Sequence, residues 1–260
     1  MLRKRLIFTL IYSDGYFMQS RNFRLQRVGD IHWLEQNYQF QEIAFSLDEL
    51  IILNASRQCK DILAFADTVS TLSQNVFIPV AAGGGIRTLE EAEILFHHGA
   101  DKIVLNSVLH ADSLLVKNLI NQYGAQSIIA SIDYKANANN TEVFIDNGTS
   151  KISYSLDDYI SHLESLNVGE IYLNSIDRDG TGFGYDTETI QLIKKKIHTP
   201  LIIAGGAGNE KHLINGLEIE DVSAVATANL FNFIDNGLPN ARKKIIESKI
   251  NIASWRTDLN

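Results

Sequence analysis

Short apolar segments alternate with amphipathic segments along most of the chain. Eight of the apolar segments are rich in Ile, Val, Leu and Ala, as strands buried on both faces are; they are Leu6–Tyr12, Glu49–Leu53, Val76–Ala81, Lys102–Leu105, Ser127–Ile132, Glu170–Leu173, Leu201–Ile203 and Ala224–Ala226. Between them, apolar residues recur every three or four positions, which predicts helices; these include Leu89–His98, Ala111–Tyr123, Ser155–Asn167 and Thr187–Ile197. Strands that alternate with helices predict parallel βαβ units.

Eight such units in 260 residues predict a closed (β/α)8 barrel, the TIM-barrel fold, occupying residues 1–260 as one domain. No linker rich in Pro or Gly divides the chain. An open, doubly wound sheet is the alternative. The polar segment Asn137–Ser150 interrupts the alternation after the fifth strand, and we expect it to form a small hairpin.

Glycine-rich motifs follow the third and the seventh predicted strands. They are Ala82–Ile86 (AGGGI) and Ala204–Gly208 (AGGAG), and Gly84 and Gly206 lie 122 positions apart. A fixed offset indicates an internal repeat, here of two half-barrels. Glycines let backbone N–H groups approach an anion closely, and a following helix adds its dipole. The repeat therefore predicts a ligand with a phosphate at each end, with tight turns alone as the alternative.

Composition narrows the class of protein. The net charge of −8 and the absence of a basic cluster argue against a nucleic-acid partner. The longest apolar run is too short to span a bilayer, and no signal peptide is recognisable at the N-terminus. The single cysteine, Cys59, excludes an internal disulfide and fits a reducing compartment, so we expect a cytoplasmic location. The histidines show no metal-ligand spacing, and we expect neither a metal nor a cofactor.

In a (β/α)8 barrel the chemistry takes place at the carboxyl ends of the strands. Polar side chains and glycines are frequent at these ends, which makes them the candidate site. The residues at these ends are Ile11, Asp14, Asn54, Gly83, Gly84, Gly85, Asn106, Ser107, Asp133, Lys135, Asn174, Asp177, Asp179, Gly180, Gly205, Gly206, Ala228 and Asn229.

The segment Asn174–Asp186 (NSIDRDGTGFGYD), the two glycine motifs and Ile132–Lys135 (IDYK) resemble the HisF family. HisF is the cyclase subunit of imidazole glycerol phosphate synthase, and the likeness runs from Met1 to about Phe233. It implies a heterodimer in which a HisH-type glutaminase docks at the N-terminal face of the barrel. Ammonia would pass through the barrel to a ribulosyl phosphate intermediate bound by both its phosphates. That chemistry needs one carboxylic acid and one carboxylate.

The resemblance also assigns individual residues. Asp133 matches the family's catalytic carboxylate after the fifth strand. The family's other catalytic Asp, after the first strand, is replaced by Ile11, which lies 122 positions before Asp133. Asp14 is no obvious substitute, because the family has an Asp there as well. The positions that match the family's phosphate groups are Gly85, Asn106 and Ser107 in the first half, and Asp179, Gly180, Gly206, Ala228 and Asn229 in the second.

Several other polar positions of the family have also changed in this chain. A lysine is replaced by Gln19, an aspartate by Asn54, a threonine by Asn174 and a serine by Ala204. The family's gate for ammonia at the base of the barrel, in contrast, is matched in full. Its residues are Arg5, Glu49, Lys102 and Glu170, and Asp101 matches a residue of the glutaminase interface. Ordinary ion pairs at the barrel base are the alternative interpretation of these charges.

Three functions follow from this pattern. The first is an ammonia-channelling subunit that has lost cyclase chemistry and works with a glutaminase and a sugar amidotransferase in amidinating a surface-polysaccharide sugar. The second is a genuine cyclase subunit of histidine biosynthesis, in which another group replaces the missing acid. The third is a scaffold that only binds a glutaminase. Retention of both phosphate motifs argues against the third.

Overall fold

The computed structural model describes residues 3–38, 43–57, 61–137 and 140–254. Cys59 therefore lies outside the described residues. Eight parallel strands form the centre of the fold: β1 (Arg5–Ser13), β4 (Glu49–Asn54), β5 (Val80–Gly83), β6 (Lys102–Leu105), β7 (Ile128–Asn137), β10 (Glu170–Ser175), β11 (Leu201–Ala204) and β12 (Val222–Thr227).

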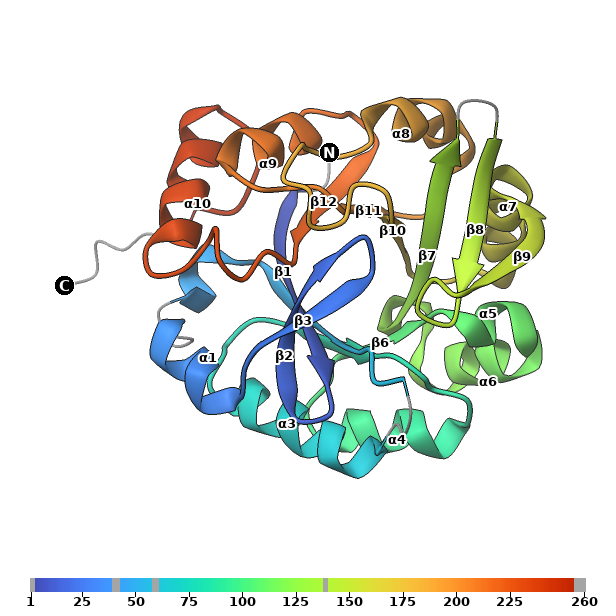
Figure 1. The fold of residues 1–260 in the computed structure, drawn as a ribbon. Coiled ribbons are helices and arrows are strands. Elements are labelled where there is room, and N and C mark those ends of the chain that lie inside the picture. The colour runs from blue at the N-terminus through green and yellow to red at the C-terminus, as the bar shows by residue number, and fades with distance from the viewer. Residues whose placement is uncertain (1–2, 39–42, 58–60, 138–139, 255–260) are drawn as a thin grey trace.

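These strands pair in sequence order, and two further pairings close the sheet. Strand β7 pairs with β10 across the insertion between them, and β12 pairs with β1 in parallel register, with Ile7 opposite Ala226. The closed order confirms the predicted (β/α)8 barrel and excludes the open, doubly wound sheet. Figure 1 shows the helices as a ring around the strands.

The helices of the ring are α1 (Ile31–Asn37), α3 (Ile62–Gln74), α4 (Leu89–His97), α5 (Ser107–Ala111), α6 (Ser113–Tyr123), α7 (Leu156–Leu166), α8 (Thr187–Ile193), α9 (Glu210–Leu217) and α10 (Gly237–Glu247). Short 3-10 turns lie at Ala44–Ser46, Ala125–Ser127 and Lys194–Lys196. Several helices begin at a side-chain cap. Thr88 and Glu91 form a capping box on α4, and Asp186 accepts from the N–H of Thr189 at the start of α8. Such caps satisfy N–H groups that have no partner within the helix.

The predicted elements are present, and several of their boundaries were wrong. The fifth strand, for example, runs to Asn137 and not to Ile132. The third strand begins at Val80 and not at Val76, because Phe77 lies in the preceding loop with 91% of its surface exposed. The helix expected over Ala111–Tyr123 is interrupted at Asp112, whose side chain caps α6. The helix expected over Thr187–Ile197 ends at Ile193 and continues as a 3-10 turn.

Apolar side chains are buried in two separate regions. The larger region lies between the strands and the surrounding helices and includes Leu6, Leu50, Phe65 and Leu163. The smaller one fills the interior of the barrel, with Ile7, Ile51, Ile129, Ile202 and Ala224 among its members. Neighbouring strand residues point to opposite faces, so the continuously apolar strands supply both regions.

Two antiparallel extensions lie at the carboxyl ends of the strands. β2 (Tyr16–Arg21) continues β1 through a tight turn and pairs with β3 (Arg24–Gly29), a hairpin that the sequence analysis did not predict. The predicted hairpin after the fifth barrel strand is confirmed and has a third strand: β8 (Asn140–Ile145) pairs with both β7 and β9 (Ser150–Ser155). In Figure 1 the β2–β3 hairpin lies in front of the barrel opening.

No helix in the described part of the chain combines the length and apolar character that crossing a membrane requires.

Candidate functional site

A cavity of about 810 Å³ opens at the carboxyl ends of the barrel strands. Most of the residues that the sequence placed at strand ends come together in its wall. They are Ile11, Asn54, Gly84, Gly85, Asn106, Ser107, Asp133, Asn174, Asp179, Gly180, Gly205, Gly206, Ala228 and Asn229. Gln19 lines the same cavity. Asp14 does not, and Lys135 lies over the ring of Phe144, with its Nζ 4.7 Å from the ring centre.

The two glycine motifs, one in each half-barrel, share the backbone conformation of their central glycine. Gly84 and Gly206 both have φ +107°, which L-residues with a side chain rarely adopt. A Cβ would lie 2.2 Å from the carbonyl oxygen of Asn54 at Gly84, and 2.1 Å from that of Gly184 at Gly206. Glycine is therefore required at both positions. The flanking positions differ, because φ is positive at Gly85 and Gly205 but not at their equivalents, Ala207 and Gly83.

These turns leave backbone donors at the cavity wall. The N–H groups of Gly85, Gly180 and Gly206 donate to no acceptor on the residues that the structure describes. Such groups can bind the oxygens of an anion. We call the wall formed by Gly85, Asn106 and Ser107 the first-half cradle. The wall formed by Gly180, Gly206, Ala228 and Asn229 is the second-half cradle.

The side chains of the two cradles are engaged differently. In the first-half cradle, Ser107 Oγ donates to Asp146 Oδ1 at 2.8 Å, and the N–H of Asp146 donates back to Ser107 Oγ at 3.2 Å. In the second-half cradle, Asn229 Oδ1 accepts from the N–H groups of Phe231 and Asn232. The side-chain oxygen of Asn229 therefore stabilises the loop after β12.

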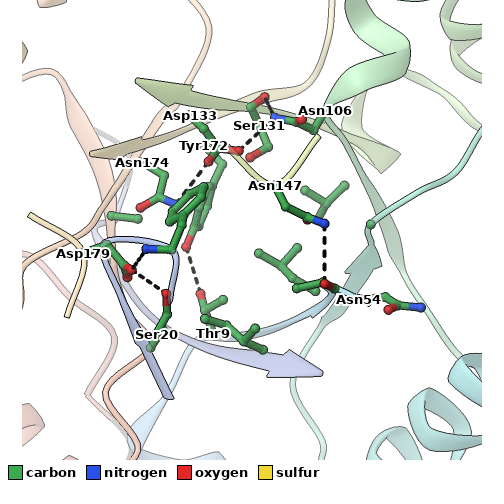
Figure 2. Close-up of a pocket in the computed structure, with 18 of the residues that line it drawn as sticks. Thr9, Ser20, Asn54, Asn106, Ser131, Asp133, Asn147, Tyr172, Asn174 and Asp179 are labelled. Carbon is green, nitrogen blue, oxygen red and sulfur yellow. Dashed lines mark hydrogen bonds between the residues drawn. The ribbon is translucent and has the colours of Figure 1, made fainter. Parts of the chain in front are cut away.

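Asp179 holds the β2–β3 hairpin to the barrel. Its carboxylate is 7% exposed and accepts from the hydroxyl of Ser20 and, at 3.0 Å, from the N–H of Phe23 (Figure 2). Asn22 lies at the same turn and donates to the carbonyl of Ile176 at 3.1 Å. The sequence placed Asp179 with the phosphate groups. In the structure its carboxylate is engaged with the hairpin, while its neighbour Gly180 presents the backbone.

Asp133 is the carboxylate that points into the centre of the cavity (Figure 2). It accepts from the side-chain amides of Asn106 and Asn174, each at 3.2 Å. Burial raises the pKa of Asp133 to about 7, opposed by the bond from Asn174 and supported by the charge of Asp179. A carboxyl group with this pKa can both give and take a proton near neutral pH.

Four further residues that the resemblance singled out, near the first two barrel strands, make other contacts. Ile11 brings an alkyl group to the cavity wall. Gln19 accepts from the N–H of Leu230 at 2.9 Å and so ties β2 to the loop after β12. Asp14 has φ +51° and Gly15 φ +87°, which places them at the β1–β2 turn, as expected of a structural Asp-Gly pair. Asn54 Oδ1 accepts from the N–H of Ser56 at 3.0 Å.

The four predicted gate residues meet at the opposite end of the barrel. Each is the first residue of its strand, on β1, β4, β6 and β10. Arg5 is 2.6 Å from Glu49 and 3.0 Å from Glu170, and Lys102 is 3.0 Å from Glu49 and 2.9 Å from Glu170. The charges thus alternate around a closed ring, which we call the charged ring. Asp101 lies beside it and accepts from the N–H of Val80 at 2.8 Å.

The barrel interior between the charged ring and the cavity is mostly apolar. Its polar feature is a bond across the interior, in which the hydroxyls of Thr9 and Tyr172 lie 3.2 Å apart (Figure 2). Both residues are buried, and both also line the bottom of the cavity. Tyr172 therefore lies where the barrel interior meets the cavity.

No cluster of His, Cys, Asp and Glu that could hold a metal ion occurs among the residues described.

The fold is a closed barrel with a two-fold repeat, and its carboxyl face has glycine cradles and a buried aspartate. Comparison of the sequence with known proteins points to a family with these features. The family described as "Histidine biosynthesis protein" matches residues 18–234. The chain belongs to this family and, within it, to the HisF proteins.

Three relatives show how far the similarity extends. A protein of Parasynechococcus marenigrum, provisionally named imidazole glycerol phosphate synthase subunit hisF2, is 44% identical over 98% of this chain and 95% of its own. The imidazole glycerol phosphate synthase subunit HisF of Pelodictyon phaeoclathratiforme is 34% identical over 97% of this chain and 99% of its own. The imidazole glycerol phosphate synthase subunit HisF of Chlorobium chlorochromatii is 35% identical over 90% of this chain and 92% of its own.

Sequence reasoning missed the residues that the two extensions contribute to the site: Ser20, Phe23, Asp146 and Asn147. The pair Asp14-Gly15 is typical of a hairpin turn and could have indicated the first extension. The second extension was predicted, and the pair Asn147-Gly148 could have located its turn. Tyr172 was also missed. Its position two residues after Glu170 in the same strand places it on the inward face.

Proposed function

We propose that this chain is the barrel subunit of a glutamine amidotransferase complex. A HisH-type glutaminase docks at the charged ring and releases ammonia, which passes through the barrel interior to the cavity. There it is used to amidinate a surface-polysaccharide sugar together with a sugar amidotransferase. The chain is one domain, and its own cyclase chemistry has been lost because Ile11 stands in place of the first catalytic Asp.

One observation supports this proposal: the two ends of the barrel differ in how many of the family's functional groups the resemblance finds there. The charged ring is complete, with all four ion pairs formed. At the other end, the cavity has Asp133 but an isoleucine at the two-fold-related position. Closing an imidazole ring requires an acid and a base, and an alkyl side chain can be neither. The passage of ammonia needs only a dry route, which the apolar interior offers.

On the proposed route, the side chain of Tyr172 has to move before ammonia can reach the cavity. Its hydroxyl bonds to Thr9 across the interior, and a change of its side-chain rotamer would break that bond. A hydrogen bond of this kind is worth roughly 1 kcal/mol net, so thermal opening is not prevented by its energy. Tyr172 and Thr9 also supply hydroxyl groups to which ammonia can hydrogen-bond on its way.

Two exposed aromatic side chains at the same end of the barrel as the charged ring support docking of a partner at this face. Phe77, in the loop before β5, has 91% of its surface exposed, and Phe45, in the turn before β4, has 59%. Both loops lie at the amino ends of their strands, as the charged ring does. Exposed aromatic residues are frequent anchors at protein interfaces.

The proposed docking predicts a mutational effect. We expect Phe77→Asp to raise the Kd for the HisH-type glutaminase of the same organism by about tenfold or more, measured by titration calorimetry. The matched control is Phe183→Asp, since Phe183 is 75% exposed but lies in the loop after β10, at the other end of the barrel. Equal weakening by both substitutions, or no association of the unaltered chain with the glutaminase, would contradict the proposal.

A genuine cyclase of histidine biosynthesis is the alternative to the channelling function. The names of the relatives at 34% and 35% identity fit it, and Asp133 is in place. It requires an acid other than residue 11. Asp179 is a candidate for this acid, because its charge raises the pKa of Asp133. Its carboxylate, however, already accepts two hydrogen bonds from the β2–β3 hairpin. Turnover of the ribulosyl phosphate intermediate with ammonium salt, in the absence of a glutaminase, separates the two functions.

A further inference from the structure

Three arginines meet at the tip of the β2–β3 hairpin. Arg21 and Arg24 are opposite each other in the antiparallel register, on either side of the turn Asn22–Phe23. Arg57, in the loop after β4, donates to the carbonyl of Phe23 at 3.0 Å. Like charges directly opposite each other in a sheet are destabilising. None of the three arginines forms an ion pair with an acidic residue in the part of the chain that the structure describes.

The charge of the hairpin differs from that of the whole chain. Residues 16–29 include the arginines Arg21, Arg24 and Arg27 and no acidic residue, whereas the chain has a net charge of −8. Two acids of the loop after β10 are engaged with the backbone: Asp179 is buried and accepts from the N–H of Phe23, and Asp177 accepts from the N–H of Ala136 at 2.9 Å. Arg21 and Arg24 are exposed, and neither lines the cavity. A ligand inside the cavity therefore does not account for them.

Two exposed phenylalanines lie on the same face of the barrel. Phe183, in the loop after β10, has 75% of its surface exposed, and Phe231, in the loop after β12, has 48%. Neither lines the cavity. Their loops are in contact, since a Cβ at Gly208 would lie 2.8 Å from the Cα of Gly182, and Asn232 Nδ2 donates to the carbonyl of Gly208 at 2.8 Å. The two rings therefore stand on adjoining loops.

The hairpin tip adjoins these loops at the mouth of the cavity. A Cβ at Gly180 would lie 2.7 Å from the Cα of Arg21, and Asn22 donates to two carbonyls of the loop after β10. Gly180 and Asn229 line the cavity, so the loops that carry the phenylalanines form part of its mouth. The hairpin itself lies in front of the barrel opening (Figure 1). We call the four exposed side chains of these segments the rim surface: Arg21, Arg24, Phe183 and Phe231.

We propose that the rim surface is the docking site of the sugar amidotransferase, and that this partner meets it with an apolar pocket flanked by acidic side chains. The inference rests on the proposed function, in which this enzyme takes part in using the ammonia. Phenylalanine and arginine are enriched at protein interfaces, and an aromatic ring in a pocket often dominates the affinity. Carboxylates of the partner relieve the repulsion between Arg21 and Arg24 and bind to both guanidinium groups.

The position of the rim surface favours this partner over other occupants. Ammonia that leaves the cavity into bulk water is protonated and diluted, so the protein that uses it has to cover the mouth. A protein seated on the rim surface does so. The glutaminase, in contrast, is proposed to dock at the charged ring, at the opposite end of the barrel. A small anion would bind the arginines but would leave the rings of Phe183 and Phe231 exposed.

The apolar part of the rim surface is tested with Phe183→Asp. The Kd of the full chain for the purified sugar amidotransferase of the same organism is measured by titration calorimetry, and we expect the substitution to raise it by about tenfold or more. The matched control is Leu192→Asp, since Leu192 is also 75% exposed but lies on α8, outside the rim surface. It should leave the Kd unchanged. Phe183→Asp should also keep its affinity for the HisH-type glutaminase, which reports that the variant is folded.

The charged part is tested with Arg24→Glu. This substitution places an acid opposite Arg21, which stabilises the hairpin, so a loss of binding would not result from unfolding. We expect the Kd for the amidotransferase to rise by about tenfold and to depend less on the NaCl concentration than that of the unaltered chain. Lys117→Glu, which reverses an exposed charge on α6, is the control and should change neither quantity.

The outcomes separate this inference from the proposed function. An unchanged Kd in Phe183→Asp or in Arg24→Glu, or equal weakening by Leu192→Asp, overturns the inference alone. A dimer of the isolated chain that Phe183→Asp abolishes, detected by sedimentation, would assign the rim surface to a second copy and also overturn it. No association of the unaltered chain with the amidotransferase would overturn the inference together with that part of the proposed function. Glutaminase docking, measured separately with Phe77→Asp, is independent of these results.

Discussion

At the scale of single residues, Asp133 and Ile11 show what a repeat can and cannot predict. The offset of 122 positions places the two at equivalent positions, and both line the cavity in the structure. The sequence therefore predicted that a carboxylate and an alkyl side chain occupy equivalent places in the cavity. It could not predict the environment of Asp133, because the amides of Asn106 and Asn174 reach it only once β6, β7 and β10 lie side by side.

The raised pKa of Asp133 predicts that this residue destabilises the fold as the pH rises. A carboxyl group whose pKa is about 7 in the folded chain and 3.8 in the unfolded chain keeps its proton up to a higher pH in the folded state. Its contribution to stability is therefore complete below about pH 4, is lost progressively up to about pH 7, and is constant above that.

We expect Asp133→Asn to remove this dependence. The free energy of unfolding of the variant, relative to that of the unaltered chain, should rise by about 2–3 kcal/mol between pH 5 and pH 8. Urea denaturation at the two pH values measures the difference. A difference between the two chains that stays the same from pH 5 to pH 8 would show that Asp133 titrates normally.

At the scale of elements, the two hairpin extensions decide how the cavity is covered. The barrel strands were predicted because their apolar residues form continuous runs, whereas β2 and β3 are short, mixed in polarity and half exposed. Their position depends on polar contacts such as those of Asp179 with Ser20 and Phe23, which are 159 and 156 residues away in the sequence. Neither periodicity nor composition reports such contacts. This is also why the sequence could not place the carboxylate of Asp179.

Removal of the Asp179 carboxylate should loosen the β2–β3 hairpin. Asp179→Ala leaves the hydroxyl of Ser20 and the N–H of Phe23 without their acceptor, at a cost of roughly 2–3 kcal/mol. Hydrogen–deuterium exchange should become faster at Tyr16–Gly29, while the exchange of β6 and β11 remains slow. Glu142→Ala, on the other extension, serves as the control and should leave Tyr16–Gly29 protected. Unchanged exchange in Asp179→Ala would mean that other contacts hold the hairpin.

At the scale of the whole molecule, the barrel connects a ring of paired charges at one end with a cavity at the other. The charged ring and the apolar interior were predictable because the ring residues begin their strands and the strand runs are continuously apolar. The asymmetry of the cavity was only partly predictable. The alkyl side chain of Ile11 is visible in the sequence, but the carboxylate of Asp146 reaches the first-half cradle through a turn 39 residues from Ser107.

The central claim is that this barrel passes ammonia on without closing an imidazole ring. The most direct test gives the purified chain the ribulosyl phosphate intermediate of histidine synthesis and a high concentration of ammonium salt, which makes the glutaminase unnecessary. We predict no loss of substrate absorbance above the uncatalysed rate, for the unaltered chain and for Ile11→Asp alike. Turnover by the unaltered chain with a kcat of roughly 1 s⁻¹ or more would contradict the account and show that Asp133 acts without an acid at position 11.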